Sequence, residues 1–156
     1  MTILKVFTGA NDKKWQVQHF LNYITDNTKH FWDGKEIPSI ELVHGYGVSI
    51  EPTVAAEEIL GLHRAFGNPG KRYFYHVLVV FSMGSVDPWQ ASLYGWEIND
   101  FLRKQGLQYI QGVHCIKGVN IAQPHLHIII NAIDPMNGTK LHIGFDFIRN
   151  FKIFAN

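Results

Sequence analysis

Apolar side chains recur every three to four residues in three stretches of the chain, which predicts three amphipathic helices. The stretches are residues 14–24, 53–66 and 88–104. In the third stretch a second apolar stripe runs along the opposite side, and its members are Trp89, Leu93 and Trp96. Two stripes on one helix predict contact with two layers of structure.

The first predicted helix divides its side chains between two faces. Its apolar stripe consists of Val17, Phe20, Leu21 and Ile24. The side chains that point away from this stripe include Trp15, His19, Asn22 and Tyr23. We therefore expect the helix to bury one face and to leave Tyr23 outside the core.

Alternating or continuous apolar residues predict β-strands in the rest of the chain. The predicted strands cover residues 2–8, 73–81, 109–116, 125–133 and 139–143, the last one after an Asn137-Gly138 hairpin turn. Residues 25–50 are rich in polar residues, glycine and proline, which predicts a long connection with a short strand at 40–43. Residues 145–156 are expected to form a helix. This order of elements predicts an α+β fold, with helices flanking a mainly antiparallel sheet.

The composition is typical of one folded domain. The 156 residues are 46% apolar and 17% charged, with a net charge of +1, and this length predicts a single domain over residues 1–156. The apolar runs are far shorter than the roughly 18 residues of a membrane helix. With Cys115 as the only cysteine and no apolar core of a secretory signal, we expect a cytoplasmic location. Because the charges nearly balance, nucleic-acid binding would have to depend on a local arrangement.

The nine histidines are unusual, and two of them share one face of a predicted strand. His125 and His127 alternate with Leu126, so their backbone positions lie about 6.6 Å apart and their imidazoles can converge on one metal ion. His114 ends the preceding predicted strand, which is expected to be an antiparallel neighbour. These three histidines form a candidate metal site. The alternative is a pair of histidines with no ligand.

Tyr23 is open to two interpretations. It can be a half-buried tyrosine of the ordinary kind, which the local pattern favours. It can also be a nucleophile whose phenolic oxygen attacks a phosphodiester that a metal ion polarises.

Four motifs follow one another along the chain. They are Asn22-Tyr23-Ile24-Thr25 with Lys29, the stretch 53–58 with Arg64-Ala65-Phe66-Gly67, the stretch 72–81 with His76, and His114 followed by Pro124-His125-Leu126-His127. Taken in order, they resemble the motifs of plasmid mobilisation relaxases, which belong to the HUH endonucleases. The likeness runs from about residue 3 to residue 143.

The resemblance implies an HUH-like sandwich of two or three layers and a metal-dependent, strand-specific DNA nuclease. It would nick and rejoin single-stranded DNA at a plasmid transfer origin, with Tyr23 forming a 5′-phosphotyrosyl link. His114, His125 and His127 would hold Mn²⁺ or Mg²⁺, and imidazole ligands suit Mn²⁺ better. Accessory relaxosome proteins are further expected partners. Because such relatives are commonly longer, we expect the chain to be the N-terminal part of a longer protein.

The expected DNA contacts come from basic residues near these motifs, namely Lys29, Lys35, Lys71 and Arg72. His76 lies within the third motif, and we assign it to DNA positioning or to structure.

Two departures from the relaxase pattern keep other functions open. Val80 stands where relatives usually have a serine before phenylalanine, and Ile116 stands where they often have an acid. These changes favour a non-catalytic DNA-binding accessory module with the same fold. A small metal-dependent nucleotide hydrolase is a third possibility.

Overall fold

The fold is built on a five-stranded antiparallel sheet. The computed structural model describes residues 3–7, 10–26, 30–32, 34–67, 71–81, 86–115 and 124–142. Its elements are, in chain order, β1 (Ile3–Phe7), α1 (Lys14–Ile24), β2 (His30–Trp32), β3 (Lys35–Ile37), the 3₁₀ helix η1 (Ser39–Leu42), β4 (Val43–Tyr46), α2 (Pro52–Ala65), β5 (Phe74–Val80), α3 (Pro88–Ile98), α4 (Asp100–Lys104), β6 (Tyr109–His114) and β7 (His125–Asn131). The strand order in the large sheet is β1-β5-β7-β6-β4, and β2 pairs with β3 separately.

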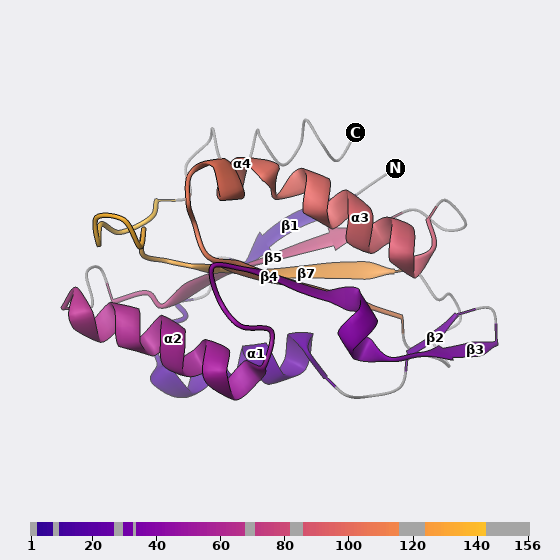
Figure 1. The fold of residues 1–156 in the computed structure, drawn as a ribbon, viewed down its shortest axis with the longest axis horizontal. Helices are drawn as coiled ribbons and strands as arrows, with labels where there is room; N and C mark the ends of the chain where they lie inside the picture. The colour runs from indigo at the N-terminus through magenta and orange to yellow at the C-terminus, as the bar shows by residue number, and fades with distance from the viewer. Residues whose placement is uncertain are drawn as a thin grey trace.

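Helices cover both faces of this sheet, so the fold has three layers. Helices α1 and α2 lie on one face, and α3 and α4 lie on the other (Figure 1). Each face has its own apolar core, one centred on Leu21, Ile59 and Ile129 and the other on Ile98 and Ile128. The predicted α+β fold with a mainly antiparallel sheet is confirmed.

Strand β7 lies at the centre of the sheet and is buried on both sides. It pairs with β5 along its whole length and with β6 from His125 to Ile130. Successive side chains enter opposite cores, because Ile128 packs on the α3 side and Ile129 on the α1 side. Two buried faces account for the almost continuous apolar run of this strand.

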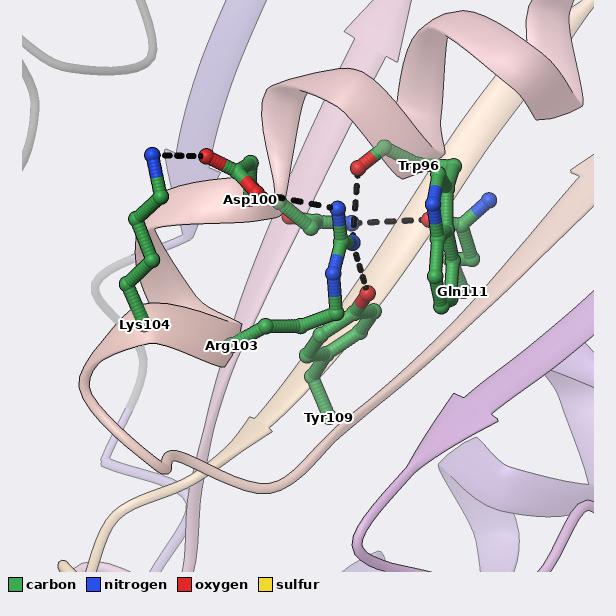
Figure 2. Close-up of polar contacts among 7 residues, drawn as sticks. Trp96, Asp100, Arg103, Lys104, Tyr109 and Gln111 are labelled. Atoms are coloured by element: carbon green, nitrogen blue, oxygen red, sulfur yellow. Dashed lines mark hydrogen bonds and ion pairs between the residues drawn. The ribbon is translucent and has the colours of Figure 1, made fainter.

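The single helix predicted over residues 88–104 is wrong, because two helices, α3 and α4, meet at Asn99. The buried Asn99 amide donates to Gln111 Oε1 of β6 at 2.8 Å. Arg103 then ties the end of α4 to its surroundings, donating from Nη1 to the Trp96 carbonyl at 2.7 Å and to Tyr109 Oη at 2.6 Å (Figure 2). A buried amide needs a hydrogen-bond partner, and here that partner comes from the sheet.

The second apolar stripe on α3 does not meet another layer within the described part of the chain, contrary to the sequence expectation. Trp89, Leu93 and Trp96 are 46%, 60% and 40% exposed. The buried side of the same helix includes Ala91 and Ile98. The stripe is therefore a surface feature.

Two of the predicted strands are also corrected. Residues 39–42 form η1, and the strand expected at 40–43 begins only at Val43. After the turn at Gly138, which has a φ of +71°, the described residues form one bridge, Ile133 to Lys140, in place of a strand. The predicted helix at 145–156 lies outside the described residues. None of the described helices is long and apolar enough to cross a membrane.

Candidate active site

Three adjacent central strands bring four histidines to the face of the sheet covered by α1. His114 of β6 stands directly opposite His125 of β7, and His127 follows on the same face. His76 of β5 stands opposite Ile129, so it shares that face as well. Alternation along each strand thus groups residues that are up to 51 positions apart in the chain.

Helix α1 holds Tyr23 over this group. The Tyr23 ring meets the His114 ring edge-on at 4.9 Å and the His127 ring at 5.2 Å, measured between centroids. Tyr23 is 44% exposed, so its ring lies between the histidines and solvent. The sequence interpretation that left Tyr23 off the apolar face agrees with this position.

A glycine in β6 makes the close approach of α1 possible. A Cβ added at Gly112 would stand 2.7 Å from both the carbonyl oxygen and Cγ2 of Ile24. The Ile24 carbonyl also accepts a hydrogen bond from Nε2 of His114 at 3.2 Å. The last turn of α1 therefore packs directly against β6, and this packing also positions Tyr23.

His76 and His127 form a buried pair. Nε2 of His76 lies 3.0 Å from Nδ1 of His127, and the two residues are 6% and 7% exposed. Phe7 stacks on His76 at 4.6 Å, and Phe20 lies at 5.4 Å from it. Burial lowers the pKa of His76 to about 4 and that of His127 to about 2. Both rings are consequently neutral at neutral pH, and one nitrogen of the pair donates to the other.

The donor chemistry of His114, His125 and His127 fits a divalent metal ion. Burial lowers the pKa of His125 as well, and neutral imidazole is the form that binds metals. In the structure, however, their side chains are not arranged around one ion. Among the described residues, no group of three or more histidine, cysteine, aspartate or glutamate side chains is positioned to hold an ion. For Nε2 of His114, coordination would replace the bond to the Ile24 carbonyl.

Of the basic residues named from the sequence, Lys71 and Arg72 are placed away from this site by the register of β5. Lys35 is exposed on β3, and Lys71 is exposed just before β5. Arg72 lies over the Tyr75 ring at 4.6 Å. Residues 71 and 72 precede the end of β5 that is farthest from His125, about 20 Å along the strand from the level of His127. Lys29 lies outside the described residues.

The contact between His76 and His127 is the feature of the site that sequence reasoning missed. The sequence assigns His76 to DNA positioning or structure, and its burial against Phe7 and Phe20 favours a role inside the protein. Alternation predicts which face His76 occupies. The pairing of β5 with β7, which the chain order leaves open, is what sets it beside His127.

A comparison with known protein families matches residues 23–156 to the family described as "Relaxase: MobA/VirD2-like, nuclease domain". This span covers most of the chain and starts at Tyr23. A search of curated proteins found no match.

Proposed function

Because the chain belongs to the relaxase family with a MobA/VirD2-like nuclease domain, we propose that it nicks and rejoins one strand of DNA at a plasmid transfer origin, through a 5′-phosphotyrosyl intermediate on Tyr23. The observation that carries the proposal is the contact of the half-exposed Tyr23 ring with His114 and His127. A phosphate that reaches the Tyr23 hydroxyl from solvent would lie beside imidazole nitrogens.

The reaction is a transesterification. The Tyr23 oxygen forms a bond to phosphorus as the bond to the 3′ oxygen of the preceding nucleotide breaks, and the phenolic proton is lost while that 3′ oxygen gains one. His114, His125 and His127 would hold the divalent ion, which would neutralise the phosphate and polarise its P–O bonds. His76 would keep the His127 ring in a fixed orientation through the bond between Nε2 and Nδ1.

The substrate of this chemistry is single-stranded DNA, in the cytoplasm where plasmid DNA resides. Mn²⁺ suits a site of imidazole ligands better than Mg²⁺, which prefers oxygen ligands. Accessory relaxosome proteins would select the origin together with this domain.

Covalent trapping tests the proposal. The wild-type protein is mixed with Mn²⁺ and single-stranded DNA of randomised sequence labelled at its 3′ end, and a denaturing gel is run. We expect a labelled adduct from the wild type and none from Tyr23→Phe. Tyr94→Phe is the matched control, because Tyr94 is 45% exposed on α3, across the sheet from Tyr23.

The position of the label adds a second criterion. A 5′-phosphotyrosyl link retains the DNA that lies 3′ of the nick, so only the 3′ label should stay with the protein. An adduct in Tyr23→Phe, or one that retains a 5′ label, would contradict the proposal.

A non-catalytic DNA-binding module is the second candidate. It is favoured by the absence, among the described residues, of a histidine or acid group arranged for a metal ion. Such a module would bind the same DNA and give no adduct with Mn²⁺ present.

A further inference from the structure

Helix α1 presents a row of side chains in line with Tyr23. Trp15, His19 and Tyr23 are each four residues apart, so they lie on one face of the helix and about 6 Å apart along its axis. Trp15 is 64% exposed, and its ring meets the His19 ring edge-on at 5.9 Å. This exposed row, which we call the α1 track, ends at the tyrosine that contacts His114 and His127.

Cations lie at the other end of the α1 track. Lys13 and Lys14 are exposed beside Trp15, and the helix itself contains no aspartate or glutamate. The backbone amide of Tyr73 donates to the carbonyl of Asn11 at 3.0 Å, which brings the preceding residues 71–72 close to the start of α1. Lys71 and Arg72, which lie far from the histidines, therefore lie near the start of α1.

We propose that the α1 track binds single-stranded DNA, with a nucleobase stacked on the indole of Trp15 and the backbone running from Tyr23 toward Lys13, Lys14 and residues 71–72. The site deepens the proposed function, on which it rests, by naming where the substrate strand lies. Trp15 and Tyr23 are about 12 Å apart along the helix. At about 3.4 Å per stacked nucleotide, the stacked base lies within a few nucleotides of the phosphate at Tyr23.

Proteins that bind single-stranded nucleic acid commonly combine base stacking on aromatic rings with cations that bind the phosphates. Every base has a π-face, so an exposed indole binds bases with little regard to sequence, while cations nearby bind the phosphates. The exposed tryptophans of α3 differ from Trp15 in their surroundings. The guanidinium of Arg103 already covers the Trp96 ring at 3.7 Å, and Glu41 lines the groove beside Trp89.

The test measures binding of a labelled dT₂₀ strand by fluorescence anisotropy, with EDTA present to prevent cleavage. Trp15→Ala should weaken binding about 5- to 150-fold, which corresponds to the loss of one stacked base. Trp15→Phe should keep most of the affinity. Trp89→Ala is the matched control, a second exposed tryptophan on the other face of the sheet, and it should bind like the wild type.

An abasic strand of equal length separates stacking from charge. The wild type should prefer dT₂₀ to the abasic strand, and Trp15→Ala should lose that preference while its affinity for the abasic strand stays unchanged. The proposal is overturned if Trp15→Ala binds dT₂₀ like the wild type, if Trp89→Ala loses as much, or if the wild type does not bind dT₂₀. Because EDTA removes the chemistry from this experiment, the Tyr23 adduct remains an independent result, and either proposal can fail alone.

Discussion

Burial of His127 has a chemical consequence beyond stability. The ring stays neutral at neutral pH because the sheet and α1 exclude water from it. With Nδ1 bonded to His76, Nε2 is the His127 nitrogen that would bind the proposed metal ion.

The first prediction concerns metal affinity. Replacing His127 with alanine removes one imidazole of the proposed metal site, so Mn²⁺ binding should weaken by more than the roughly 10- to 100-fold that loss of a supporting residue costs. Titration calorimetry of the wild type and His127→Ala measures this directly. His44→Ala is the control, because His44 is exposed on the edge strand β4. Equal affinity in the wild type and His127→Ala would remove His127 from the metal site.

At the scale of elements, the sequence predicts best the parts whose pattern is local. The stripe of α1 gives its bounds of residues 14–24, and the alternation around Leu126 identifies the shared face of His125 and His127. The break between α3 and α4 at Asn99 is different, because the bond of the Asn99 side chain to Gln111 of β6 depends on how α3 packs on the sheet. The contact of Tyr23 with the histidines likewise depends on how α1 sits on the sheet, which no short pattern encodes.

The second prediction concerns the close packing of α1 against β6. Gly112→Ala puts a methyl group 2.7 Å from the Ile24 carbonyl, so the end of α1 must move away from the sheet. We expect a loss of about 1–3 kcal/mol in the free energy of unfolding and a lower yield of the covalent adduct. Urea unfolding and the trapping gel measure the two effects.

Gly61→Ala provides the matched control for Gly112→Ala. Gly61 lies within α2, and an added Cβ would meet only the flexible Arg64 side chain at 3.7 Å. This substitution should be neutral or stabilise by up to about 1 kcal/mol. If Gly112→Ala behaves in the same way, the close approach of α1 is not required.

At the scale of the whole molecule, three buried histidines make stability depend on pH. Burial lowers the pKa of His63, which lies near the Tyr73 carbonyl and the Asn131 side chain, and lowers those of His76 and His127. The unfolded chain takes up protons on these residues near pH 6.5, while the folded protein does not. The contribution of these histidines to the free energy of unfolding is therefore largest above pH 6.5. It falls as the pH drops toward their pKa values in the folded protein.

The third prediction follows from that difference. Between pH 7 and pH 5.5, with EDTA present, each of His76 and His127 should remove about 1 kcal/mol from the free energy of unfolding. Urea unfolding at several pH values above 5 measures the slope, and His76→Phe should reduce it by the share of one histidine. A stability that is constant or rises on acidification would contradict this assignment.

The fourth prediction concerns the salt dependence of DNA binding. Each phosphate contact on a single strand contributes about −0.7 to the slope of log affinity against log salt. If Lys13, Lys14, Lys71 and Arg72, the cations near the start of α1, all make such contacts, the slope is about −3. Lys71→Ala should reduce the magnitude of the slope by about 0.7. Lys104→Ala should leave the slope unchanged, because the Lys104 side chain is paired with Asp100 at 2.7 Å. A wild-type affinity that is independent of salt would mean that phosphates are not bound.

The central place of β7 also sets an order of events during synthesis. In chain order it is the last strand that the structure describes, but in the sheet it lies between β5 and β6. Both of these neighbours leave the ribosome before it does. A nascent chain that ends before residue 125 therefore carries Tyr23, His76 and His114 but lacks His125 and His127. In such a chain, β5 and β6 each have an edge that is not hydrogen-bonded and can pair with other chains. Only when residue 131 has emerged can the five-stranded sheet form, so His125 and His127 are the last of these histidines to join Tyr23.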